Sequence, residues 1–149
     1  MELIEYFRIL WSASIRLLEG KATNTQITIL KQKALSIEKI TDYKQKEAYM
    51  DLYLDYSDFY YQIALFTHNK HLINEVKIVN DKFRMMRYFY PIEIQRDFPY
   101  VKYAFVQTQI IQSLQNKKHL LPAHIIFEQS YDDKYVISHM FNLQKEWRM

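Results

Sequence analysis

The sequence predicts an all-α protein: an antiparallel bundle of six to seven helices in a single domain over residues 1–149. The first observation is that Gly20 is the only glycine, where average usage predicts roughly ten. Hairpin turns, β-bulges and phosphate-binding loops need residues that accept positive φ, so β-sandwiches, dinucleotide-binding folds and P-loops are disfavoured. The second is that only three prolines interrupt the chain. The third is that apolar residues recur at helical spacing through most of its length.

The first two expected helices cover residues 2–19 and 25–40. Gly20 stands where a helix C-terminus is expected. Thr23 or Asn24 is expected to cap the second helix, because their side-chain oxygens can accept from its first N–H groups. The residues expected to face inward are Leu3, Phe7, Leu10, Ser14, Leu17 and Leu18, followed by Ile27, Leu30, Ala34 and Ile37.

The third segment has the clearest periodicity. Its apolar positions are separated by 4, 4, 3, 4 and 3 residues: Ala48, Leu52, Tyr56, Phe59, Ile63 and Phe66. Further tyrosines widen this stripe, as is typical of a helix enclosed on more than one side. Asn69 is expected to end it and to cap the next helix, which runs to Tyr90 and stops before Pro91.

The remaining chain predicts two or three more helices. Asp97 and Pro99 suit the start of the next one, because proline is favoured in a first turn. Its expected inward residues are Val101, Ala104, Phe105, Thr108, Ile111 and Leu114. A shorter helix is expected over residues 122–129, and a last one from Asp132 or Asp133 to Lys145.

Composition and charge exclude several classes of protein. The net charge of +3 comes from scattered basic residues, without the clustering typical of nucleic-acid-binding surfaces. The chain has no cysteine, which excludes a disulfide scaffold and a thiolate site and is compatible with the cytoplasmic location that we expect. Apolar runs fall far short of the ~20 residues of a membrane span, so no membrane partner is expected.

No catalytic or metal-binding motif stands out. The five histidines include no His-Glu-x-x-His pair and are interpreted as surface or partly satisfied side chains. No serine lies in a G-x-S-x-G elbow. Asp55 and Asp58 are three residues apart and are interpreted as a solvated helix face rather than as a shared proton or metal site. We therefore expect no enzyme, no metal and no cofactor.

The tyrosines of the third segment allow two interpretations. Tyr49, Tyr53, Tyr56 and Tyr60 fall on one side of the expected helix. They are either core and interface aromatics, or they line an internal cavity with their hydroxyls, which need partners when buried.

Residues 56–72, YSDFYYQIALFTHNKHL, resemble a signature of GntR-family transcriptional regulators. The resemblance is to their C-terminal effector-binding and dimerisation domain, of the FadR or FCD type. That family shows Asp, two residues, Phe-His, a small apolar run, then Asn with Leu three residues on. The positions in register are Phe59, Ala64, Asn69 and Leu72, with Leu10, Leu17, Leu18, Lys21 and Ala22 upstream and Ile110, Ser113 and Leu114 downstream. The resemblance covers residues of about 3–130 and implies a FadR C-terminal-like bundle.

The sequence departs from this family at the metal site. In many members, Asp and His of the first motif and two later His bind a metal in the centre of the bundle. Here those positions hold Tyr56, Tyr60 and Gln107, and the last falls near Gln129 or Gln144. Phenols and amides are poor substitutes for carboxylate and imidazole ligands, so we expect no metal.

The resemblance also implies where an effector would bind. The predicted pocket is formed by Tyr53, Tyr56, Tyr60 and Gln107 and is neutral, which favours an uncharged or aromatic effector. The arginine that often meets a carboxylate effector falls at Phe7, one residue before Arg8, and we include Arg8 in the predicted pocket.

The function that the resemblance implies is a ligand-sensing and dimerisation domain of a GntR-type transcription regulator. Its expected partners are an unidentified small-molecule effector and a second copy of the chain. DNA contact is expected only through a winged helix-turn-helix domain, which we do not find in this sequence. Two alternatives stay open: a purely structural dimerisation module with a filled cavity, and the ligand-binding domain of a TetR-type repressor.

Overall fold

The computed structural model describes residues 2–38, 57–88, 100–116, 118–119 and 121–131. Throughout these ranges the regular secondary structure is helical, without a strand. The helices are α1 (Glu2–Leu18), α2 (Asn24–Glu38), a helix over residues 57–66, α4 (Lys70–Tyr88), α6 (Tyr100–Gln115) and α7 (Ala123–Tyr131). The all-α prediction is confirmed for this part of the chain.

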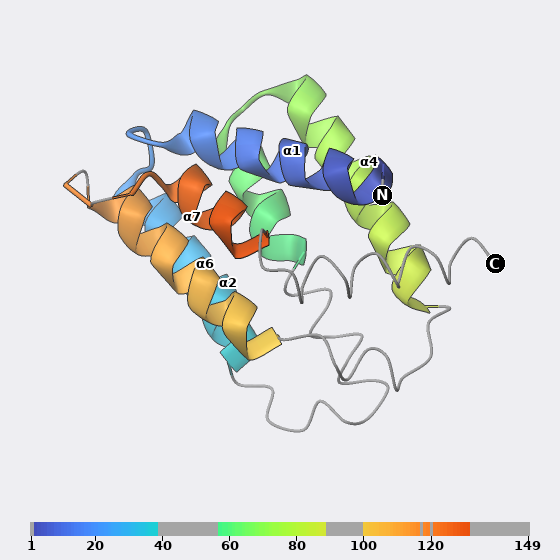
Figure 1. Cartoon of the computed structure of the whole chain (residues 1–149). Coiled ribbons are helices and arrows are strands. Elements are labelled where there is room, and N and C mark those ends of the chain that lie inside the picture. Colours follow the sequence, from blue (N-terminus) through green and yellow to red (C-terminus); the bar gives the residue numbers. More distant parts are fainter. Residues whose placement is uncertain (1, 39–56, 89–99, 117, 120, 132–149) are drawn as a thin grey trace.

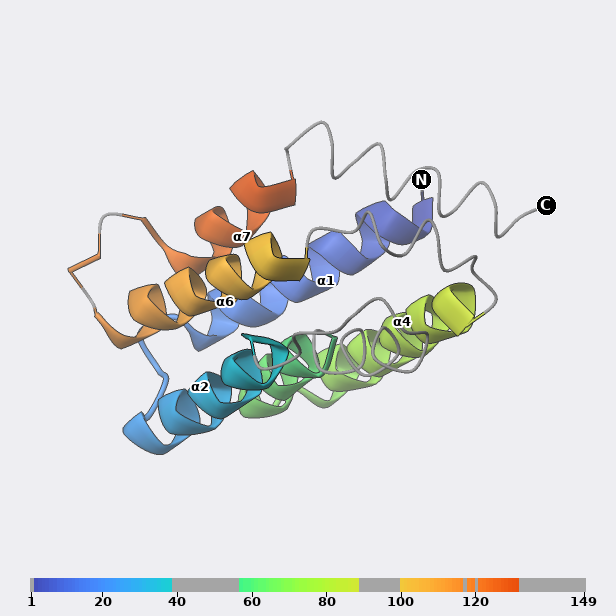
Figure 2. The ribbon, with the colours of Figure 1, turned by 90° about the horizontal axis from the view of Figure 1, so that it is seen from below.

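The described helices form two layers (Figures 1 and 2). In one layer α7 lies between α1 and α6 and contacts both. The other layer consists of α2, the helix over residues 57–66 and α4. Contacts of α2 with α6 and of α1 with α4 join the layers. The core therefore lies between two sets of helices whose apolar faces are turned toward each other.

Most of the described residues predicted to face inward are buried. They are Phe7, Leu10, Ser14, Leu18, Ile27, Leu30, Ala34, Phe59, Ile63, Val76, Val79, Ile111 and Leu114. The largest completely or almost completely buried side chains are aromatic: Trp11, Tyr60, Phe7, Phe59 and Phe127. The high aromatic content of the sequence thus supplies the centre of the core.

Two predicted inward residues are exposed. Phe105 is 61% exposed, because the buried stripe of α6 follows Gln107, Ile110 and Leu114 and leaves Phe105 on the opposite side of the helix. Leu17 is 43% exposed. The inward stripe of α1 instead includes Trp11 and Ile15, which the sequence reading did not select.

The connection between α1 and α2 has the predicted caps. Gly20 has φ +73°, a left-handed conformation that glycine adopts without strain. Thr23 and Gln26 form a reciprocal capping box: the Gln26 N–H donates to Thr23 Oγ1 (3.1 Å), and the Thr23 N–H donates to Gln26 Oε1 (3.0 Å). Of the two candidate caps, Thr23 is therefore the one that acts.

Asn69 caps α4 as predicted. Its Oδ1 accepts from the Leu72 N–H at 3.1 Å. The preceding residue, His68, has φ 57° and turns the chain between the two helices. Histidine is an uncommon choice for this left-handed conformation, and nothing in the periodicity pointed to it.

Other predicted elements lie outside the described residues. They are the first half of the third segment with Ala48, Leu52 and Tyr56, the turn at Asp97–Pro99, and the last predicted helix beyond Tyr131. Among the helices that the structure does describe, none has the length and hydrophobicity needed to cross a bilayer.

Candidate functional site

Two of the predicted pocket residues, Tyr60 and Gln107, are completely buried. Tyr60 comes from the helix over residues 57–66 and Gln107 from α6, so they belong to different layers. The Tyr60 hydroxyl and Gln107 Oε1 are themselves enclosed, which brings two uncharged polar groups into an apolar interior. Tyr53 and Tyr56 lie outside the described residues.

The surroundings of Tyr60 are aromatic. Trp11 stacks on its ring with centroids 4.1 Å apart and planes 9° from parallel. Phe59 approaches edge-on at 5.1 Å, and Phe127 lies tilted at 5.3 Å. Phe7 packs edge-on against Trp11 at 4.7 Å. These arrangements suit the ring quadrupoles, and they fill the space on the Trp11 side of Tyr60.

A buried amide connects this cluster with α4. The Trp11 indole N–H donates to Asn80 Oδ1 at 3.0 Å, and Asn80 Nδ2 donates to the carbonyl of Ser57 at 3.1 Å. Trp11, Asn80 and Ser57 are all buried. One side chain therefore joins α1, α4 and the start of the helix over residues 57–66, and both ends of its amide are satisfied.

Arg8, the remaining predicted site residue, lines a different space. It contributes with Glu5, Ile9 and Ser12 of α1 and Glu128 of α7 to a surface pocket of about 380 Å³. Tyr60 and Gln107 are not among the described residues of this lining. The structure thus brings Tyr60 and Gln107 into the core and leaves Arg8 at a pocket on the outside of the bundle.

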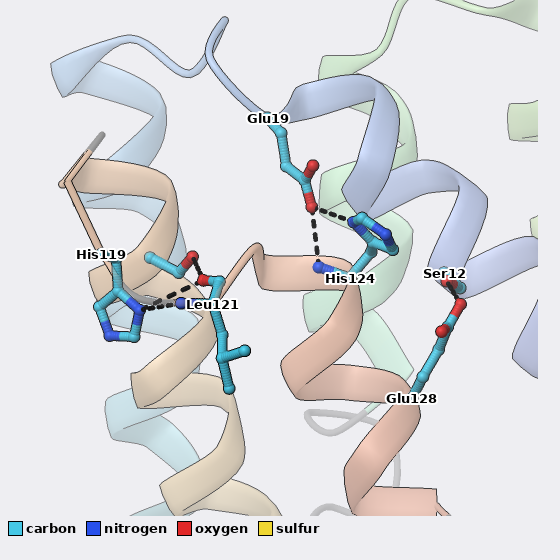
Figure 3. A network of polar contacts seen from close by, with 7 residues as sticks. Ser12, Glu19, His119, Leu121, His124 and Glu128 are labelled. Atoms are coloured by element: carbon cyan, nitrogen blue, oxygen red, sulfur yellow. Dashed lines mark hydrogen bonds and ion pairs between the residues drawn. The ribbon is translucent and has the colours of Figure 1, made fainter.

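Glu19 holds the end of α1 against the start of α7 (Figure 3). Its Oε1 accepts from the backbone N–H of His124 at 2.9 Å and lies 2.5 Å from His124 Nδ1. A carboxylate at this place is favoured because it meets the N–H groups and the positive dipole of a helix N-terminus. His124 is thus engaged in a structural contact.

Other charged contacts join helices at the surface. Lys33 of α2 pairs with Asp58, so the carboxylate predicted to lie on a solvated face is partly exposed and joins two helices. The Tyr6 hydroxyl donates to Glu75 Oε2 at 2.6 Å. This hydrogen bond raises the pKa of Tyr6, because ionisation would place a phenolate beside a carboxylate.

Among the described residues, no group of three or more His, Asp or Glu side chains lies close enough to hold a metal ion. His119 Nδ1 lies 3.2 Å from the carbonyl oxygen and 3.3 Å from the amide nitrogen of Leu121, within the loop before α7.

Comparisons with protein-family models, curated proteins and solved structures found no match for this chain. The site is therefore interpreted from its own residues. Sequence reasoning missed Trp11 and Asn80, which organise the interior. Asn80 follows Val76 by four residues, and this position on the apolar stripe of α4 was the available signal.

Proposed function

We propose that the chain is the ligand-sensing and dimerisation domain of a GntR-type transcription regulator. Its bundle would bind a small effector in the interior, and binding would change how two copies hold their DNA-reading domains. A FadR C-terminal-like arrangement of the helices belongs to this proposal.

The observation that carries the proposal is the burial of Tyr60 together with Gln107. The family resemblance assigns both positions to the ligand site, although they lie far apart in the sequence. Burying a hydroxyl and an amide costs free energy unless they are hydrogen-bonded, so a purely apolar pair would be the simpler core. Donor and acceptor groups that carry no charge suit recognition of an uncharged or aromatic ligand.

The signature segment gives further support. Phe59 and Ala64, two of its positions, face the core, and Asn69 supplies the cap that its spacing to Leu72 requires. These positions therefore have physical roles that a helix–turn–helix segment of this pattern needs.

A second candidate is the structural dimerisation module. It is favoured by Trp11, whose ring covers one face of Tyr60 at stacking distance. In that case the aromatic rings take the place of an effector, and no ligand stabilises the fold.

A thermal-shift titration separates these functions. We expect at least one compound in a panel of uncharged and aromatic metabolites to raise Tm by roughly 5–10 °C at one hundred times its Kd. We expect Zn²⁺ and Ni²⁺ to give no such shift, because the phenol and amide positions are poor ligands. Tyr60→Phe should weaken the response to the compound, whereas Tyr61→Phe, at a partly buried neighbour, should not.

Two outcomes would contradict the sensor. A panel without any stabilising compound would favour the structural module. Stoichiometric metal by mass spectrometry, or stabilisation by Zn²⁺ that Tyr60→Phe abolishes, would show that the motif alignment is wrong.

Dimerisation is tested by sedimentation. We expect the mass of a dimer at micromolar concentration, because α1 and α4 expose large apolar side chains: Ile9 is 64% and Met85 54% exposed. Such side chains are enriched in interfaces. Ile9→Glu and Met85→Glu should shift the equilibrium toward monomer, with Leu121→Glu, outside both helices, as the matched control. A monomeric mass for the unaltered chain across this range would count against the proposal.

A further inference from the structure

The surface pocket between α1 and α7 is built by helical spacing. Glu5, Arg8, Ile9 and Ser12 are separated by three, one and three residues, which places them on one face of α1. Glu128 of α7 lines the same pocket. Its volume of about 380 Å³ is within the range of small-molecule sites.

One carboxylate of the pocket is held in position. Ser12 Oγ donates to Glu128 Oε1 at 2.6 Å, a contact between α1 and α7 that Figure 3 shows. Ser12 is only 8% exposed, so this hydroxyl is fixed by the packing around it. A carboxylate has about four acceptor positions, and Ser12 uses one of them. Glu128 therefore retains capacity for a cationic donor without having to reorganise.

The lining combines charges of both signs with an apolar wall. Glu5 and Glu128 supply two negative charges, and Arg8 supplies a guanidinium, the group best suited to a planar carboxylate. Ile9 is 64% exposed and gives an aliphatic surface in the same lining. A molecule that matches all of these groups has an ammonium group, a carboxylate and a short aliphatic arm.

We propose that this pocket binds a zwitterionic aliphatic α-amino acid. Its ammonium group is received by Glu128 and Glu5, its carboxylate by Arg8, and its side chain lies against Ile9. The inference goes beyond the proposed function and does not depend on it, because Tyr60 and Gln107 take no part in this lining.

Three matched probes test the charge requirement. L-leucine carries both charged groups, 3-methylbutylamine lacks the carboxylate, and 4-methylpentanoate lacks the amine. Titrations of the full chain by calorimetry and by amide chemical shifts at low salt should give leucine the tightest binding. Each half-probe should bind at least about tenfold more weakly, since it loses a charge-assisted contact.

Variants assign the two ends. Glu128→Gln retains an acceptor for Ser12 and should weaken leucine at least about tenfold while leaving 4-methylpentanoate unchanged. Arg8→Gln should weaken leucine and leave 3-methylbutylamine unchanged. Asp81→Asn removes one negative charge from the exposed surface of α4 and should alter neither.

Several results would overturn the proposal. They are a leucine Kd weaker than about 1 mM, binding of either half-probe as tight as leucine, or a loss with Asp81→Asn as large as with Glu128→Gln. Tyr60→Phe should leave leucine binding intact, so failure at this pocket is distinguishable from failure of the interior site.

Discussion

Trp11→Ala should lower the free energy of unfolding by about 3–5 kcal/mol through lost packing alone. A further loss of about 1–3 kcal/mol is expected, because Asn80 Oδ1 then remains buried without its donor. Trp11 is 2% exposed and stacks on Tyr60, so the cavity left behind lies in the centre of the aromatic cluster. Urea unfolding followed by far-ultraviolet circular dichroism measures the change.

Two further variants separate packing from hydrogen bonding. Trp11→Phe retains a ring against Tyr60 but removes the indole N–H, so its loss should be smaller than that of the alanine variant. Combining Trp11→Phe with Asn80→Ala in a double-mutant cycle should give a coupling energy within about 0.5–3 kcal/mol. A coupling near zero would show that the contact between Trp11 and Asn80 contributes nothing to stability.

Phe59→Ala is expected to cost about 3–5 kcal/mol. Phe59 is fully buried, packs edge-on against Tyr60, and comes from the clearest periodic segment of the sequence. Many domains have a total stability of only about 5–15 kcal/mol, so this variant should unfold at much lower urea concentration.

Phe105→Ala provides the matched control, because the same side chain is 61% exposed on α6. Its effect should stay within about 0.5 kcal/mol, as for most surface substitutions. Similar losses for the two phenylalanines, or a loss below about 1 kcal/mol for Phe59→Ala, would show that this core assignment is wrong.

The helices and their ends could be predicted because their causes are local. Gly20, Thr23 and Asn69 act within a few residues of their own positions, so conformational preference and capping chemistry are sufficient. The face of α6 was harder to predict. Phe105 and Gln107 could each be placed inward by a helical period, and hydrophobicity favoured the wrong one.

The candidate site was predictable only in part. The family resemblance pointed to Tyr60 and Gln107, and both are buried. The partners that depend on tertiary structure were not predictable: Glu128 meets Ser12, and Glu19 meets His124, across more than one hundred residues. Nothing in a local pattern specifies such pairs, because they follow from the packing of α7 against α1.

The packing of α1 against α7 also bears on how the chain acquires its structure during synthesis. The ribosome releases α1 first, whereas α7, which supplies Glu128 and Phe127, emerges more than one hundred residues later. Until then Trp11 and its apolar neighbours lack part of their cover, and exposed apolar surface of this kind invites aggregation and chaperone binding. Closing so long a loop is also slow compared with forming the individual helices. The N-terminal helix is therefore made early but completed late.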